Sequence, residues 1–190
     1  MKTIYYISAN KYKRTEVLEV LSRLLPADRL RAEAVELKIH EIQHQDMAAI
    51  ARDKVIKAYK MIGRHCFVEQ TGLQIKSFGN LPGGLTQLFW DSLRAEKFAD
   101  FFVSHNATAV LAKTVLAYCD GRRVLCFEGE TEGIIVRPSV EERFQWDCVF
   151  RPSGSECVFA EMTLEEKNMY SMRKKALMKF AAYLEEAYDR

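Results

Sequence analysis

The 190-residue sequence predicts an α/β protein whose mixed, twisted sheet is flanked by helices. Three observations predict this class. Strand-like and helix-like segments alternate through the first half of the chain, two strand-like segments flank an Asp-Gly turn in the second half, and one helical stripe of apolar residues follows near the C-terminus. The length suits one domain over residues 1–190, built as a single body or as two closely packed lobes.

The first strand and helix carry clear local signals. An apolar run at residues 3–8 predicts a buried strand, and Asn10 follows it where a helix needs an N-cap. Valine and leucine then recur at helical spacing from Val17 to Leu25, and Pro26 ends that helix. The alternation of apolar and polar residues from 35 to 39 predicts a second strand.

A second helix is predicted over residues 46–62, because its apolar residues follow a 3.6-residue period and Gly63 can end it. Asp120 and Gly121 lie between apolar runs, which is a strong hairpin signal. The other predicted elements are a short strand at 66–69, a loop at 80–84, a helix at 85–102, strands at 108–118, 123–127 and 133–136, an irregular stretch at 137–155, and a last helix with apolar residues Ala176, Leu177, Phe180, Leu184 and Ala187.

Composition argues against several function classes. The net charge is only +2 with 28% charged residues, which disfavours broad nucleic-acid binding. No stretch approaches the roughly 20 apolar residues of a membrane helix, and the N-terminal apolar run is too short for a signal peptide. The five cysteines are odd in number and form no Cys-x-x-Cys, as expected for reduced thiols. We therefore expect a cytoplasmic protein with no nucleic-acid or membrane partner.

The segment HEIQH, residues 40–44, matches the HExxH pattern of zinc peptidases. That chemistry needs a helix, because only positions i and i+4 on one helical face direct both imidazoles to one metal ion. Here His40 ends an alternating strand pattern and His44 precedes the next helix. The context argues against a zinc peptidase.

Two other segments suggest a ligand site, each with a structural alternative. Ser8, Asn10 and Lys13 lie at a strand-to-helix junction, where hydroxyl, amide and helix N-terminal N–H groups favour a phosphate. The alternative is an ordinary N-cap with a solvated lysine. Further on, Trp146 and Asp147 could stack on a base and accept a hydrogen bond from it, or could be a core tryptophan beside a turn aspartate.

Basic residues gather near the predicted start of the last helix, where Lys167 and Arg173 flank Ser171. Cations at a helix N-terminus are electrostatically unfavourable, so a bound anion or base would explain them. The alternative is a solvated basic face.

Taken in order, these segments resemble the inosine triphosphate pyrophosphatase family, whose Ham1-like members remove non-canonical purine nucleotides. SANKYK resembles the family's T-G-N-x-x-K, and EIQ at 41–43 resembles its acidic element after the second strand. VEQTGL and GNLPGG resemble V-E-D-T/S-G-L and the Gly-Pro loop after it. FEGETEGII, FQWDCVFRPSG and FAEMTLEEKNMYSMR resemble the remaining motifs. The likeness covers nearly the whole chain.

The resemblance implies two lobes around a nucleotide-binding cleft and usually a dimer. It implies that (d)ITP or XTP is converted to the monophosphate and pyrophosphate with Mg²⁺. By motif, the residues at the triphosphate would be Ser8, Asn10, Lys13 and Lys54. Lys167 would help to hold the nucleotide, and Thr71 would also be one of the nucleotide-binding residues. Phe144 and Trp146 would pack by the base, Asp147 and Arg173 would read its edge, and Glu41 and Glu69 would lie nearest the metal.

The departures from the family pattern are informative. Gln70 replaces the second acid of the E-D-T/S-G-L motif, and an amide cannot act as a general base and is a poorer ligand for Mg²⁺. Met172 replaces a histidine that would face the purine. Gln87 lies where some members carry a lysine.

Two hypotheses follow from Gln70. The first is a catalytically impaired member that binds (d)ITP or XTP as a sensor and signals its occupancy to a partner. Some relatives look like nucleotide-sensing subunits of bacterial antiphage systems beside NAD-consuming effectors, which suggests such a partner. Such a chain would form a homodimer or a complex with an effector protein. The alternative is an active pyrophosphatase in which Glu69 or Glu41 takes over the missing role.

Overall fold

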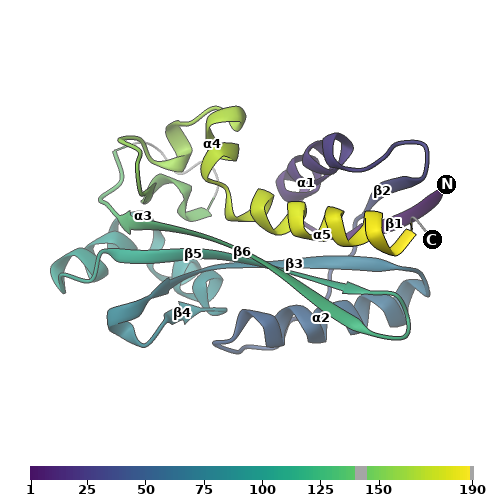
Figure 1. Ribbon diagram of the computed structural model, residues 1–190. Helices are drawn as coiled ribbons and strands as arrows, with labels where there is room; N and C mark the ends of the chain where they lie inside the picture. Colours follow the sequence, from purple (N-terminus) through teal and green to yellow (C-terminus); the bar gives the residue numbers. More distant parts are fainter. Residues whose placement is uncertain (140–144, 189–190) are drawn as a thin grey trace.

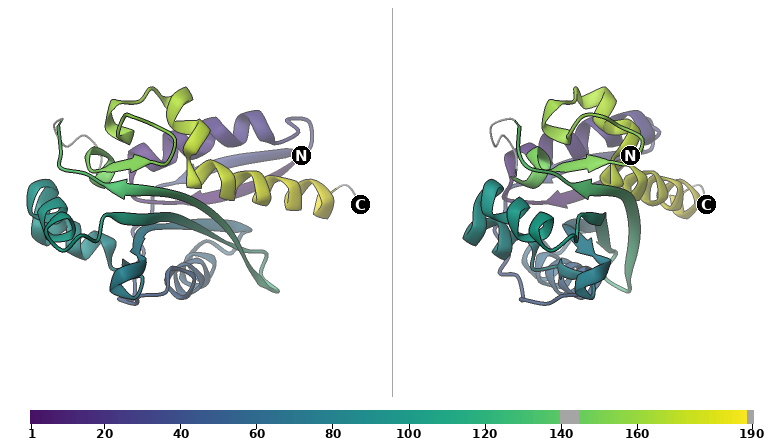
Figure 2. Two further views of the ribbon diagram at one scale, coloured as in Figure 1. Left: turned by 60° about the vertical axis from the view of Figure 1, so that its left-hand side comes forward. Right: turned by 90° about the vertical axis from the view of Figure 1, so that its left-hand side faces the viewer.

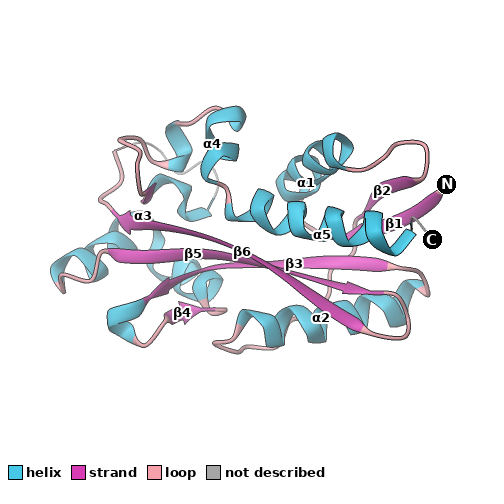
Figure 3. Cartoon of the chain, viewed as in Figure 1, coloured by secondary structure: helices cyan, strands magenta, loops and turns pink. Residues whose placement is uncertain are grey.

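The computed structural model describes residues 1–139 and 145–188, and one mixed sheet runs through it (Figures 1 and 3). The strands are ordered β2-β1-β3-β5-β6-β7, and β4 pairs with β3. Helices α1 and α5 cover one face of the sheet and α2 covers the other, which Figure 2 shows from two further sides. The predicted α/β class is confirmed, whereas the division into two lobes stays a prediction.

The elements in chain order are β1 (Lys2–Ile7), α1 (Lys11–Leu24), β2 (Leu30–Val35), α2 (Met47–Ile62), β3 (Cys66–Ile75), η1 (Lys76–Phe78), β4 (Leu81–Gly83), α3 (Thr86–Ser104), β5 (Ala109–Cys119), β6 (Val124–Ile135), η2 (Gln145–Cys148), β7 (Phe150–Pro152), η3 (Phe159–Glu161), α4 (Leu164–Tyr170) and α5 (Met172–Tyr188). Here η marks a short 3₁₀ helix. None of the helices in these ranges is both long and apolar enough to cross a membrane.

Local signals placed the first two helices correctly. Asn10 caps α1 and accepts a hydrogen bond from the N–H of Lys13, and Asp46 caps α2 in the same way through the N–H of Ala48. Gly63 ends α2 in the left-handed conformation, with φ 63°. The predicted hairpin around the Asp120 turn is confirmed as β5 and β6. The two strands predicted at 123–127 and 133–136 are wrong in extent, because β6 runs without a break from Val124 to Ile135.

Two other strand predictions were wrong in extent. The second strand is Leu30–Val35 and not 35–39, because the chain leaves the sheet after Val35 while Leu37 and Ile39 still pack on the α2 side of the core. The third strand continues through Gly72 to Ile75, although glycine disfavours strands. A Cβ at Gly72 would lie 2.3 Å from the backbone oxygen of Gly83, so the close approach of β4 requires glycine there.

The last predicted helix is in fact two helices. α4 ends at Tyr170 and α5 begins at Met172, with Ser171 between them. α5 lies directly on β6, because a Cβ at Gly129 would come 1.9 Å from the backbone oxygen of Met172. This contact sets the height of the first turn of α5, and with it the position of Arg173, above the sheet.

The sheet has a gap beside the interior strand β3, between β1 and β4. β1 pairs with β3 at Tyr5 and Tyr6 and ends at Ile7, and β4 joins the same edge of β3 only at Leu73. Between these two strands, this side of β3 has no strand partner from residue 69 to residue 72 among the described residues.

The cysteines differ in reactivity because they differ in burial. All five are free; Cys157 is exposed, and burial next to Cys119 raises the pKa of the Cys66 thiol to about 12. Since only the thiolate reacts, we expect one fast-reacting thiol when native protein meets Ellman's reagent at pH near 8. Cys157→Ser should remove the fast phase and leave the slow thiols to react only in denaturant. A fast phase that survives this substitution would contradict the assignment.

Candidate functional site

A polar cleft of about 190 Å³ opens at the gap beside β3, between β1 and β4. The β1–α1 junction, α2, β3, α3 and the start of η2 all contribute to its wall. The predicted site residues that line it are Ser8, Asn10, Lys13, Glu41, Lys54, Glu69, Gln70, Thr71 and Trp146. Phe144 lies outside the described residues. Asp147, Lys167 and Arg173 lie behind this lining.

The β1–α1 junction forms one wall of the cleft through its capping bonds. The hydroxyl of Ser8 accepts from the N–H of Asn10 at 3.2 Å, and the Asn10 side chain accepts from the N–H of Lys13 at 3.1 Å. The N-cap alternative is thus correct for Asn10, but Lys13 is not solvated. Its side chain is 15% exposed and its Nζ lies 3.1 Å from an Oε1 of Glu69.

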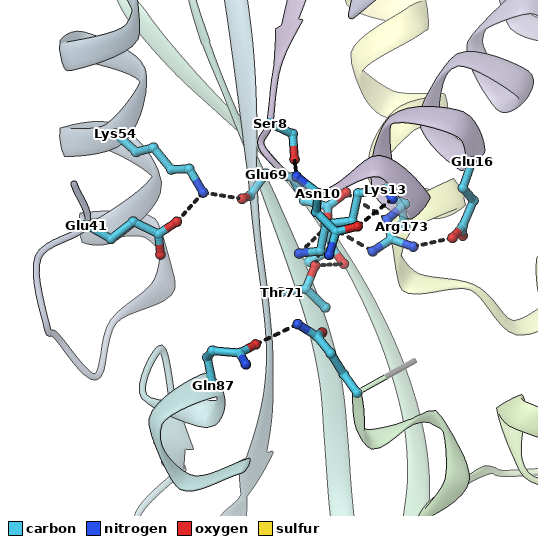
Figure 4. A network of polar contacts seen from close by, with 12 residues as sticks. Ser8, Asn10, Lys13, Glu16, Glu41, Lys54, Glu69, Thr71, Gln87 and Arg173 are labelled. Atoms are coloured by element: carbon cyan, nitrogen blue, oxygen red, sulfur yellow. Dashed lines mark hydrogen bonds and ion pairs between the residues drawn. The ribbon is translucent and has the colours of Figure 1, made fainter. Parts of the chain in front are cut away.

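Glu69 belongs to a buried ion cluster between β3, α1 and α5 (Figure 4). Arg173 donates from Nε to Oε2 at 2.7 Å and from Nη2 to Oε1 at 2.9 Å, and Thr71 donates to Oε1 at 2.9 Å. Burial alone would raise the pKa of Glu69, but Arg173 and Lys13 hold it well below its ordinary range. Glu69 is therefore ionised and poorly suited to accept a proton near neutral pH.

Arg173 is held by two carboxylates. Besides its bonds to Glu69, it donates from Nη1 to an oxygen of Glu16 at 2.6 Å. Burial alone would lower the pKa of Arg173, but the charges of Glu69 and Glu16 raise it above its ordinary value. The cation near the start of α5 thus has a partner within the protein, and the solvated-face alternative is wrong for Arg173, which is 2% exposed. Sequence reasoning missed Glu16, whose one signal is its place one helical turn after Lys13.

Gln70 lies on the opposite face of β3 from Glu69, because neighbouring strand residues point to opposite sides. It is 8% exposed and lines the cleft. On the same side Lys54 pairs with Glu41 at 2.5 Å and donates to the backbone oxygen of Glu69 at 3.4 Å. Among the described residues of the cleft lining, the acids are Glu41 and Glu69, and each is paired with a lysine.

The predicted base-binding residues are linked to the core. Trp146 packs edge-on against Phe150, with ring centroids 5.6 Å apart, so the core interpretation is correct. It is also part of the cleft wall, and its stacking on a base stays a prediction. Asp147 pairs with Lys167 at 2.5 Å. Burial raises the pKa of Asp147 and Lys167 opposes that rise.

The mouth of the cleft is bridged by two amides that sequence analysis did not pair. Gln145 donates from Nε2 to Oε1 of Gln87 at 2.5 Å, and Gln87 in turn donates to Asp91 at 2.8 Å. Figure 4 shows the contact of Gln87 with a side chain from the opposite wall. Met172, where the family pattern has histidine, is 3% exposed and packs in the core.

The zinc-peptidase geometry is absent from HEIQH. Residues 40–44 are not helical, and Nδ1 of His44 accepts from the N–H of Asp46 at 3.0 Å. Within residues 1–139 and 145–188, no three His, Cys, Asp or Glu side chains gather as a metal site.

A magnesium ion fits one side of the cleft better than the other. Mg²⁺ is usually held by one or two carboxylates together with substrate phosphates. The Glu41 side chain is 38% exposed and pairs only with Lys54 among the described residues, so it can offer an oxygen. The Glu69 oxygens already accept from Arg173, Thr71 and Lys13.

Comparison with known proteins identifies the family of the chain. Residues 4–183 match the sequence model of the Ham1 family. The chain belongs to the Ham1 family. The inosine triphosphate pyrophosphatase of Puccinia graminis f. sp. tritici is 33% identical over 180 residues, which cover 93% of this chain and 93% of that protein. The inosine triphosphate pyrophosphatase of Aspergillus fumigatus is 36% identical over 186 residues, covering 95% and 94%.

Solved structures agree on the fold of this Ham1 family member. A HAM1 protein from Coxiella burnetii superposes with a TM-score of 0.83 at 23% identity, covering 98% of this chain and 100% of that chain. The resemblance predicted from the ordered motifs is therefore confirmed at the level of the family and its fold.

Proposed function

We propose that the cleft binds a purine nucleoside triphosphate, (d)ITP or XTP, and that the chain hydrolyses it to the monophosphate and pyrophosphate with Mg²⁺. The observation that carries this proposal is the placement of Lys13 and Lys54 on either side of the gap in the sheet, next to the capped N-terminus of α1. The names of the related inosine triphosphate pyrophosphatases support the substrate and the reaction.

Lys13 and Lys54 would exchange their carboxylate partners for phosphate oxygens. Each contacts one acid, Glu69 or Glu41, and a triphosphate supplies stronger anionic acceptors. Release from Lys54 would free Glu41 to hold Mg²⁺ together with the phosphates, and the metal would neutralise charge that develops on them. Ser8 and Asn10 would orient the phosphates, while Trp146, with Phe144, Asp147, Lys167 and Arg173, would position the base.

A second candidate is the same binding with little turnover, and Gln70 favours it. Of the two lining acids among the described residues, Glu69 is held by Arg173 and Glu41 is paired with Lys54, and Gln70 is neutral and cannot act as a general base. A bound state that persists would suit a sensor whose occupancy biases a partner. The predicted NAD-consuming antiphage effector, the dimer and the cytoplasmic location stay predictions, and neighbouring genes are the first place to look for the effector.

Both candidates are tested by dITP binding followed by a pyrophosphate assay. We expect dITP at 100 times its Kd to stabilise the protein by about 2.7 kcal/mol in thermal unfolding. Lys13→Ala should lose most of this effect for dITP and little for deoxyinosine, because only the triphosphate contacts the lysine. The matched control is Lys11→Ala, an exposed lysine of the same helical turn.

The outcomes separate the candidates. Stabilisation with Mg²⁺-dependent pyrophosphate release supports the hydrolase. Stabilisation without release supports the sensor. No stabilisation by dITP, ITP or XTP would overturn both.

A further inference from the structure

A second polar hollow, of about 350 Å³, lies at the far end of β1 from the cleft. Lys2 at the start of β1 lines this hollow, whereas Ser8, just after the end of β1, lines the cleft. A strand rises about 3.3 Å per residue, so these two residues lie about 20 Å apart. The start of β1 and the end of α5 lie side by side here (Figure 1), and Nζ of Lys2 is 4.3 Å from the ring centre of Tyr188.

The wall of this hollow carries more positive than negative charge. Lys2, Arg122 and Arg123 line it, and Asp120 is the one acid among its described lining residues. Both oxygens of Asp120 are already in use. Oδ1 accepts from the N–H groups of Arg122 and Arg123 at 2.9 Å each, and Oδ2 accepts from Nε of Arg123 at 3.3 Å. Arg123 also donates to the hydroxyl of Tyr183 at 3.1 Å, so its charge is held within the protein.

The other two cations of the hollow have no carboxylate partner among the described residues. The Arg122 side chain makes no ion pair or hydrogen bond in that part of the chain, and Lys2 contacts only the ring of Tyr188. A further acid, Glu186, lines an adjoining hollow beside Arg123 and is not part of this one. Two uncompensated positive charges therefore line one polar hollow.

The hollow is held in shape by three side chains that bond to one another. Nδ1 of His65 contacts the hydroxyls of Tyr118 and Tyr188 at 2.9 Å each, and the two hydroxyls contact each other at 2.8 Å. These contacts fix the end of α5 to β5, and with it the ring on which Lys2 lies. A site whose groups are fixed before the ligand arrives loses less conformational entropy on binding.

We propose that this hollow is a second anion site, which binds the phosphate group of a small phosphorylated molecule between Lys2 and Arg122. A guanidinium matches two phosphate oxygens at once, and a lysine adds a point charge. The volume lies near the lower end of the range for small-molecule pockets, roughly 300–1,000 Å³. The rings of Tyr183 and Tyr188 supply the apolar part of the wall. Two cations are too few for a nucleic acid, which needs a longer basic stripe.

The site is tested with inorganic phosphate, titrated into the wild-type chain at constant ionic strength while amide NMR spectra are recorded. We expect saturable shifts of the N–H signals of Arg122 and Arg123, which lie in the turn that lines the hollow. Phosphate bound in the cleft would be seen separately, through the N–H groups of Asn10 and Lys13. Each site therefore has its own Kd.

Two substitutions then test which cations hold the phosphate. Arg122→Gln and Lys2→Gln should each raise the Kd read at the Arg123 amide at least about tenfold, because each removes one charged contact. The matched control is Arg64→Gln, since Arg64 is exposed, contacts the Tyr5 hydroxyl at 3.3 Å and does not line the hollow. It should leave this Kd nearly unchanged.

Three outcomes would overturn the second anion site. One is a titration in which the amides of Arg122 and Arg123 show no saturable shift. Another is an equal loss of affinity in all three variants, which would indicate general attraction to a positive surface. The last is the same shifts on titration with sodium chloride, since a site built for phosphate must prefer it to chloride.

Discussion

Gln70→Asp is expected to raise the rate of Mg²⁺-dependent pyrophosphate release from dITP by about 10²–10⁴-fold, the usual contribution of a general base. Gln70 lines the cleft on the side of β3 that faces α2, where Lys54 and Glu41 also lie, away from the Glu69–Arg173 pair. A carboxylate there can accept a proton from the attacking water and can supply the metal with a charged oxygen. The measurement is steady-state turnover at saturating dITP.

Gln70→Asn is the matched control for this gain. Asparagine has the length of aspartate but keeps the neutral amide, so it separates the effect of shape from the effect of charge. We expect no gain with asparagine. An equal gain in both variants would show that side-chain length limits the wild-type rate, and no gain in either, with dITP still bound, would place the base elsewhere, with Glu41 as the next residue to test.

Arg173→Met is expected to lower the free energy of unfolding by about 3–5 kcal/mol at neutral pH, because it leaves buried carboxylates without their main counter-ion. The side chains of Arg173 and Glu69 are 3% and 1% exposed, and Glu16 loses its cation as well. Urea denaturation measures the loss. The matched control is Arg137→Met, which breaks the exposed pair with Asp100 and should cost less than about 1 kcal/mol.

The Glu69–Arg173 pair makes the free energy of unfolding depend on pH in the acid range. The folded-state pKa of Glu69 lies below its ordinary value, so its stabilising contribution is present above about pH 4.3 and is lost as the pH falls toward the folded-state pKa. In Arg173→Met this part of the acid dependence should shrink. Equal costs for Arg173→Met and Arg137→Met would contradict the buried pair.

The fold was predictable where the signal was local. Asn10, Asp46 and Gly63 act on the residues beside them, and the Asp120 turn joins adjacent strands. The length of β3 was not predictable, because Gly72 is justified only by the approach of Gly83. The position of β2 was misread for a similar reason, since alternation also occurs where an irregular segment packs against a core.

The candidate site, too, was predictable only where the signal was local. The β1–α1 motif and the VEQTGL strand each predicted their own lining residues, which meet at the gap in the sheet. The pairing of Arg173 with Glu16 was not predictable, because the two residues lie 157 positions apart along the chain. Likewise, nothing in the sequence pairs Gln87 with Gln145, 58 residues apart.

The contact of α5 with Gly129 has a consequence for anyone who redesigns this pocket. Gly129 is not among the lining residues and lies two strands away from β3. It nevertheless acts as a spacer, because any side chain there would lift the first turn of α5 from the sheet. Arg173, on that turn, would then be drawn back from Glu69. Mutational libraries restricted to the cleft wall would therefore omit a position that controls the geometry of the whole ion cluster.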